Sequence, residues 1–344
     1  MVTLQLIQRV RLALAITGLV LACAPSPLRA QDAPFSGVAR QTMANILKIP
    51  AADPNVSVTV QSTREEDGLV VQDISWESLD GQRPVAYVMY PANATGRLPA
   101  ILFGHGSSGS RASESAKVFG IGPWTNAHGK KSTRLLGAAR ELARRGYLVL
   151  SITHRGIDSR LPDTEDDAKD LLVHGRNLMG AEVYELRQAI TYLRQRKEVD
   201  PKRIGMTGFS FGGITTFYTW LVDLRIAAAA PVSCAVGSLD TYLRLTPRRG
   251  YIGFTLWTPG MLKWGDQADF AAAMAPRPLM LWAPTNNISM PKEAVDRFIE
   301  VVQPAYTRAG AKDALVVHQV PGGHSFGLEA FAALNEFFDQ HLKN

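Results

Sequence analysis

Cysteine is nearly absent from this sequence, which contains only Cys23 and Cys234. If Cys23 is removed with a leader segment, no internal disulfide can form. Cys234 ends an apolar run and is expected to be a small buried residue. The sequence also lacks a cysteine–histidine cluster and a paired-histidine helix motif, so no metal site is indicated.

Long hydrophobic runs are absent as well, and no segment is predicted to span a membrane. The apolar stretch Leu12–Ala24 follows Arg9 and Arg11 and has about half the length that a spanning helix needs. The polar region after it ends in Leu28-Arg29-Ala30, which fits a cleavage site. We therefore predict a secretory signal peptide over residues 1–30 and an exported protein, periplasmic or secreted.

The same segment allows a second interpretation, a lipoprotein signal. Val20-Leu21-Ala22 precedes Cys23, but Leu21 stands where a small residue is usual. The soluble exported form is therefore preferred, and anchoring at Cys23 is the alternative.

A strong excess of one charge is also lacking. The formal charge of +6 falls to +3 once the three arginines of the leader are removed. The basic clusters Lys130-Lys131 and Arg248-Arg249 lie in expected loops, where solvated side chains are common. No nucleic-acid partner is predicted.

Short strand-like runs dominate what is present. Three early runs, at residues 56–60, 69–76 and 85–90, are joined by turn signals and predict an antiparallel start to a sheet. From residue 98 the runs become continuously apolar, which is typical of strands buried on both faces. These runs are Pro99–Phe103, Tyr147–Ile152, Arg203–Thr207, Ile226–Val232, Pro278–Trp282 and Leu315–Val320.

Helical patterns separate most of these runs. The expected fold class is therefore α/β, with a mostly parallel central sheet and helices on both faces. We expect residues 31–344 to form a single domain, with inserted loops near residues 107–131 and 235–275.

A serine between glycines is the most informative motif. Gly208-Phe209-Ser210-Phe211-Gly212 follows the strand-like Arg203–Thr207 and precedes the helix-like Ile214–Val222. A serine at such a strand-to-helix turn can be held with its hydroxyl exposed, as a nucleophile needs. Ser210 is the candidate nucleophile.

A serine nucleophile needs a base and donors for the oxyanion. His324 follows Gly322-Gly323 and the last strand-like run, so it is the candidate base. The oxyanion donors are expected to be the amides of Phe211 and Ser107. His105 is expected to be structural, and the chemistry requires no cofactor.

Taken together, these motifs resemble those of the α/β-hydrolase superfamily, most closely its dienelactone-hydrolase and acetyl-xylan-esterase-like branch. The resemblance covers roughly residues 85–342. It is carried by the following segments: His105-Gly106, His154-Arg155-Gly156, residues 198–213, Ala275–Leu279 and Gly322-Gly323-His324.

The resemblance exposes one departure. Relatives carry an aspartate where this chain has Asn287, and an asparagine cannot supply the charge that stabilises an imidazolium. Three interpretations stay open. Asn287 orients His324 in a weakened triad; the acid has moved to Asp240, after the preceding strand; or the protein has lost most catalysis and only binds.

The sequence thus predicts an exported serine hydrolase, a carboxylic-ester hydrolase acting through an acyl-enzyme on small-molecule or carbohydrate esters. The rivals are a serine exopeptidase of the prolyl-oligopeptidase type and a catalytically weakened binding protein. The sequence does not determine the oligomeric state.

Overall fold

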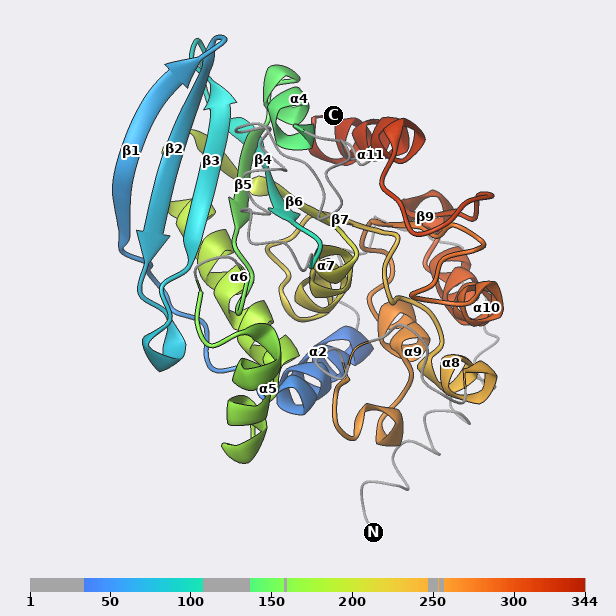
Figure 1. The fold of residues 1–344 in the computed structure, drawn as a ribbon. Coiled ribbons are helices and arrows are strands. Elements are labelled where there is room, and N and C mark those ends of the chain that lie inside the picture. The colour runs from blue at the N-terminus through green and yellow to red at the C-terminus, as the bar shows by residue number, and fades with distance from the viewer. Residues whose placement is uncertain (1–33, 108–136, 158–159, 247–252, 254–256, 344) are drawn as a thin grey trace.

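The computed structural model of the protein describes residues 34–107, 137–157, 160–246, 253 and 257–343. Within these residues nine strands form one sheet, in the order β1-β2-β3-β5-β4-β6-β7-β8-β9 (Figure 1). The expected leader and nearly all of the expected insert at 107–131 lie outside the described residues.

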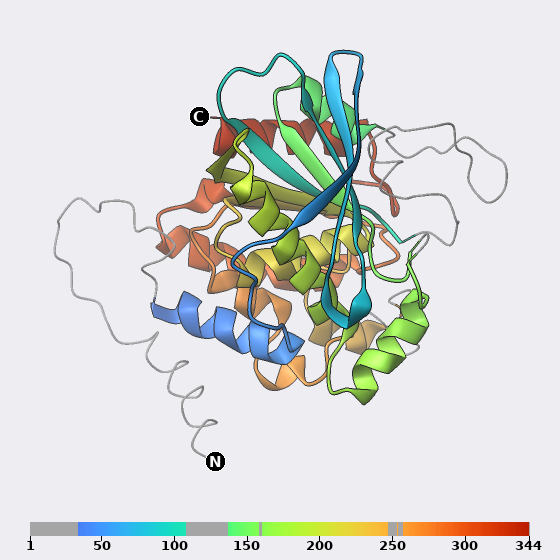
Figure 2. The same ribbon diagram turned by 90° about the vertical axis from the view of Figure 1, so that its left-hand side faces the viewer.

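The first three strands are antiparallel, as predicted. They are β1 (Val58–Glu66), β2 (Leu69–Trp76) and β3 (Val85–Pro91). The strand β1 continues well beyond Val60 because its pairing with β2 persists to the turn at Asp67-Gly68. Figure 2 shows this part of the sheet from its edge, where the strands twist strongly.

The remaining strands are parallel to one another, and β3 pairs antiparallel with β5. They are β4 (Leu98–Gly104), β5 (Leu148–Ile152), β6 (Val199–Phe209), β7 (Ala228–Val232), β8 (Leu279–Trp282) and β9 (Leu315–His318). The predicted mostly parallel sheet is confirmed.

Helices cover both faces of this sheet. On one face lie α4 (Ala138–Arg144) and α11 (Leu328–Leu342); on the other lie α2 (Pro34–Leu47), α6 (Leu178–Gln195), α7 (Phe211–Val222) and α10 (Lys292–Arg308) (Figures 1 and 2). Along β4, Ile101 and Phe103 pack in the core under α4 and α11, whereas Ala100 and Leu102 pack in the core on the opposite face. The sequences of the parallel strands are continuously apolar because both faces of these strands are buried.

The segment 235–275, expected to be an inserted loop or small lid, contains regular structure in its described part. It contains α8 (Leu239–Leu245), the 3₁₀ turn Met261–Lys263 and α9 (Gln267–Ala272), and α8 and α9 pack beside α10. Two further helices, α2 and α5 (Thr164–Val173), were not predicted. Short 3₁₀ turns at Leu79–Gly81 and Lys312–Ala314 complete the described elements. None of the helices in the described part of the chain has the length and apolarity to cross a membrane.

Candidate active site

The candidate site lies at the edge of the sheet where the parallel strands end. Ser210 follows β6, and the loops after β4, β8 and β9 carry Ser107, Asn287 and His324. Because the carboxyl ends of parallel strands meet at one edge, the fold brings together side chains that are distant in the sequence.

The backbone of Ser210 is strained. Its φ of 57° and ψ of −113° lie in a region that few residues other than glycine adopt. The Ser210 N–H donates to the Val232 carbonyl at 3.1 Å, and its carbonyl accepts the N–H groups of Gly213 and Ile214 at 3.0 and 3.1 Å. These bonds to β7 and α7 hold the strained turn, as expected of a nucleophile elbow.

Close approach of the backbone explains the flanking glycines. A Cβ on Gly212 would lie 2.1 Å from the Gly104 carbonyl oxygen, and one on Gly208 would lie 2.4 Å from the Gly212 carbonyl oxygen. The end of β4 and the start of α7 therefore touch through backbone atoms alone, so a side chain at either glycine would push the elbow away from β4.

We expect Gly212→Ala to destabilise the protein, because the added methyl group meets backbone that cannot rotate away. Overpacking of this kind typically costs about 1–3 kcal/mol. Gly327→Ala is the control, since a Cβ there meets nothing within 4 Å and its φ is −106°. Urea unfolding measures both, and equal midpoints for the two variants would contradict the close-approach explanation.

The imidazole of His324 lies between Ser210 and Asn287. Its Nε2 is 2.9 Å from Ser210 Oγ, and its Nδ1 is 2.9 Å from Asn287 Oδ1 and 3.2 Å from Ser289 Oγ. The Ser289 main-chain N–H donates to Asn287 Oδ1 at 3.0 Å, which identifies that atom as the oxygen of the amide. Nδ1 must then carry the hydrogen, and Nε2 is left to accept the proton of Ser210.

The loops around His324 are tied together. The Asn286 N–H donates to the Gly322 carbonyl at 2.9 Å, and the Ser233 hydroxyl donates to the Ser325 carbonyl at 2.6 Å. Asn287 itself is only 7 % exposed. The orientation of His324 is therefore held from both flanking loops.

The structure does not bring Asp240, the alternative orienter, to His324. Its carboxylate is exposed at the start of α8 and pairs with Arg244 at 2.9 Å, and it makes no hydrogen bond or ion pair with His324. The loop after β7 is bound to α10, because the Ser238 N–H donates to the Ala294 carbonyl at 2.8 Å. Asp240 then falls on the solvent side of the first turn of α8.

Both amides expected as oxyanion donors are free within the described part of the chain. Phe211 is the first residue of α7, where an N–H has no acceptor within the helix. Ser107 lies two residues after His105, whose carbonyl accepts the Gly212 N–H at 2.9 Å. That bond ties the Ser107 loop to the elbow.

Ser289 is a site residue that the sequence reasoning missed. It contacts both Asn287 and His324, but only the folded loop shows this. Its sole signal in the sequence was its position two residues after Asn287.

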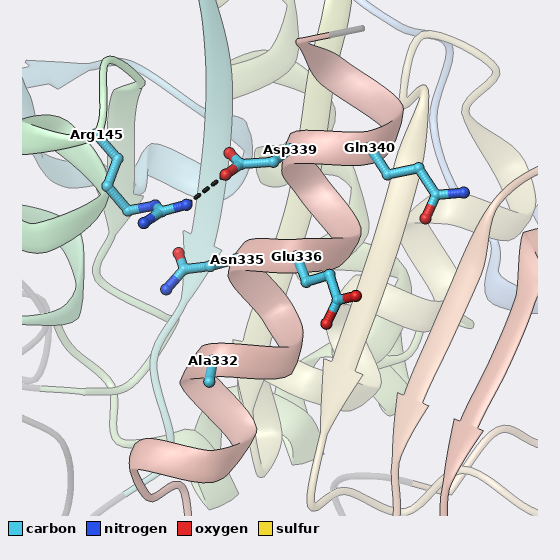
Figure 3. A pocket seen from close by; sticks show the side chains of 6 residues that line it. All are labelled: Arg145, Ala332, Asn335, Glu336, Asp339 and Gln340. Carbon is cyan, nitrogen blue, oxygen red and sulfur yellow. Dashed lines mark hydrogen bonds and ion pairs between the residues drawn. The ribbon is translucent and has the colours of Figure 1, made fainter.

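A hollow elsewhere on the surface offers no comparable chemistry. Figure 3 shows it beside α11, lined by Arg145, Ala332, Asn335, Glu336, Asp339 and Gln340. Arg145 pairs with Asp339, which also accepts the Tyr147 hydroxyl at 2.8 Å. The charged side chains of Arg145 and Asp339 in this hollow thus form an ordinary surface ion pair. In the described residues no cluster of His, Cys, Asp or Glu is placed to hold a metal ion.

Comparison with known proteins finds similarity to hydrolases. Residues 86–234 match the Dienelactone hydrolase family, a span that includes Ser210 and Phe211. The chain is 26 % identical over 271 residues to the candidate hydrolase YtaP of Bacillus subtilis (strain 168), covering 78 % of this chain and 87 % of that protein.

Solved structures share the fold. A candidate acetyl xylan esterase from Bacteroides fragilis superposes with a TM-score of 0.67 at 20 % identity, covering 87 % of this chain and 77 % of the other. The glucuronoyl esterase from Solibacter usitatus superposes with a TM-score of 0.64 at 15 % identity, covering 88 % and 91 %. At these identities the likeness concerns the α/β-hydrolase fold.

Proposed function

We propose that this chain, an esterase-like hydrolase with the α/β-hydrolase fold and similarity to the dienelactone hydrolase family, is a serine esterase that forms an acyl-enzyme on Ser210. One observation carries the proposal. The Ser210 hydroxyl, on a strained elbow, lies 2.9 Å from His324 Nε2, and the hydrogen on Nδ1 leaves Nε2 as the ring nitrogen that can accept a proton.

The reaction follows from this geometry. Ser210 Oγ attacks the ester carbonyl while His324 Nε2 takes the hydroxyl proton. The oxyanion of the tetrahedral intermediate accepts hydrogen bonds from the Phe211 and Ser107 amides. His324 then gives its proton to the departing alkoxide, and an alcohol leaves. Water, deprotonated by His324, attacks the acyl-enzyme; the bond from the acyl carbon to Ser210 Oγ then breaks, His324 returns the proton to Ser210 Oγ, and the acid leaves. No cofactor takes part.

Asn287 is the proposed orienter of His324. Its oxygen holds the Nδ1–H tautomer in place, which is the tautomer that the base needs. It adds no charge to stabilise the imidazolium that forms, so we propose a working but weakened triad.

The proposed substrates are small-molecule or carbohydrate esters, and the proposed location is outside the cytoplasm, because the predicted leader directs export. Relatives named as acetyl xylan and glucuronoyl esterases support the carbohydrate class. The expected single hydrolase domain and the oxyanion roles of Ser107 and Phe211 form part of the same proposal.

The full chain, processed or unprocessed, is tested with a fluorophosphonate probe and with p-nitrophenyl acetate. The esterase proposal expects labelling and turnover. A binding protein would give neither, and a serine exopeptidase would be labelled but would prefer dipeptide p-nitroanilides to the ester.

Replacement of the alternative orienter gives a further prediction. Asp240→Ala should leave kcat within about twofold, because the carboxylate is exposed and paired with Arg244. Asn287→Ala should lower kcat by about tenfold or more, because Nδ1 loses its acceptor. Steady-state kinetics on the ester compare the two; a large loss in Asp240→Ala with an intact Asn287→Ala enzyme would reverse the assignment.

A further inference from the structure

A buried histidine–glutamate pair lies next to the loop that carries Ser107. His154, just after β5, and Glu182, in α6, are both 0 % exposed. The proposed reaction does not use either side chain directly. Removing such a pair from water is unfavourable unless its contacts compensate, so its surroundings are informative.

Each polar atom of this pair has a partner. His154 Nδ1–H donates to Glu182 Oε2 at 2.9 Å, and His154 Nε2–H donates to the His105 carbonyl at 3.1 Å. Glu182 Oε1 accepts the Arg155 N–H at 2.7 Å. Because a carbonyl oxygen can only accept, the Nε2 of His154 carries a hydrogen. Burial alone would raise the pKa of Glu182, but the charge and hydrogen bond of His154, together with Arg160, hold that pKa below its ordinary value.

The main chain of His154 determines the tautomer of His105. The His154 N–H donates to His105 Nε2 at 3.0 Å, so that nitrogen carries no hydrogen. The hydrogen of the His105 ring is then on Nδ1, which lies 2.9 Å from the Gly106 carbonyl oxygen and donates to it. The Gly106 carbonyl is thereby held by a hydrogen bond from the His105 ring, and that ring is itself only 1 % exposed.

Holding the Gly106 carbonyl also aims the Ser107 amide. The two groups belong to one planar peptide, and this peptide is not among the cis bonds of the described chain. In a trans peptide the C=O and the N–H point in opposite directions, so fixing one fixes the other. The Phe211 amide is held in the same way, since Gly213 and Ile214 bond to the Ser210 carbonyl on the same peptide.

We propose that His154, with its ring held by Glu182, is a positioning residue that aims the Ser107 N–H at the developing oxyanion. It acts through His105, by bonding to its carbonyl and selecting its tautomer. The inference rests on the proposed function, because it concerns residues that position a donor of the same oxyanion hole. A misdirected donor weakens binding of the transition state more than binding of the substrate, so the effect falls on kcat.

Two replacements of His154 separate this role from plain packing. His154→Leu removes the ring donor to the His105 carbonyl, whereas His154→Gln retains an amide N–H near the position of Nε2. Glu185→Gln is the matched control. Glu185 is a second fully buried glutamate of α6, but it pairs with Arg155 and Arg160 and does not touch the His105 loop.

We expect His154→Leu to lower kcat for p-nitrophenyl acetate by about 10- to 100-fold with KM within about threefold. Inhibition by a trifluoromethyl ketone, which forms a tetrahedral adduct with the serine, should weaken by a similar factor. His154→Gln should recover most of both losses. Glu185→Gln should lower Tm without changing inhibitor affinity. Wild-type kcat and ketone affinity in His154→Leu would overturn the proposal, as would a folded His154→Gln enzyme no better than His154→Leu.

A measurement on the unmodified protein covers the case in which the variants do not fold. Nitrogen NMR of histidine-labelled protein should show His105 protonated at Nδ1 alone and a hydrogen on His154 Nε2. A hydrogen on His105 Nε2 would exclude the His154 N–H as its donor and overturn the proposal. The two levels of inference remain distinguishable. Failure of the esterase proposal appears as an unlabelled wild-type protein, whatever the histidine tautomers are.

Discussion

Ser210→Ala is expected to abolish fluorophosphonate labelling and to lower kcat for p-nitrophenyl acetate by at least about 1,000-fold. The hydroxyl is the only part of the residue that changes. Alanine keeps the Cβ, so the backbone at φ 57° is no more strained than before, and the main-chain bonds to Val232, Gly213 and Ile214 remain. A folded protein without a nucleophile is the expected product.

The control for this replacement is Ser325→Ala. Ser325 follows His324 directly and is exposed, and among the described residues its hydroxyl donates to the Gly323 carbonyl at 3.3 Å. Labelling should survive in this variant. Labelling that persists in Ser210→Ala but disappears in Ser325→Ala would move the nucleophile away from the elbow and refute the acyl-enzyme proposal.

Asn287→Asp is expected to raise kcat by about 10- to 100-fold, which corresponds to about 1.4–2.7 kcal/mol in the activation free energy. In serine proteases the opposite change costs about 10⁴-fold, largely because the histidine adopts the wrong tautomer. In this chain Asn287 Oδ1 is held as an acceptor by the Ser289 N–H, so the tautomer is already correct. The replacement therefore adds only the missing negative charge, and its expected effect on kcat is smaller than the 10⁴-fold effect in serine proteases.

The site has room for that carboxylate. Asn287 Nδ2 makes no hydrogen bond with any described residue, so an oxygen in its place forfeits no acceptor. Oδ1 keeps the bonds from His324 and Ser289. Asn286→Asp is the matched control, because it adds the same charge one residue away on an exposed side chain. Steady-state kinetics decide the question: equal gains in both variants would indicate a long-range electrostatic effect, and a fall in kcat for a stable Asn287→Asp protein would contradict the weakened-triad proposal.

Local patterns were sufficient for much of the architecture. Continuous apolar runs such as Pro99–Phe103 predicted buried strands, and β4 buries its side chains under helices on both faces. The glycine-flanked Ser210 and the Gly-Gly-His segment were placed correctly relative to the strands, because Ser210 follows β6 directly and Gly322-Gly323-His324 lies in the loop after β9. Segments without such periodicity are less predictable, and the short helices α8 and α9 within 235–275 carry no such pattern.

These local patterns do not predict contacts between loops. Asn287 and Asp240 both follow strands, and position alone favoured neither as the partner of His324. The structure distinguishes them through main-chain bonds: the Asn286 N–H ties one loop to Gly322, while Ser238 ties the other to α10. The joint contact of His105 with His154 and with Gly212 escaped the sequence for the same reason.

The sequence by itself determined the order of the described strands along the chain, the strand-to-helix turn at Ser210 and the absence of a carboxylate at position 287, because these depend on neighbouring residues and on residue type. The tertiary structure decided which side chain reaches Nδ1 of His324, why Gly212 must lack a side chain, and how the Ser107 amide is held. Each of these depends on the approach of segments that are far apart in the chain, to within a few tenths of an ångström, and hydrogen bonds between those segments establish it.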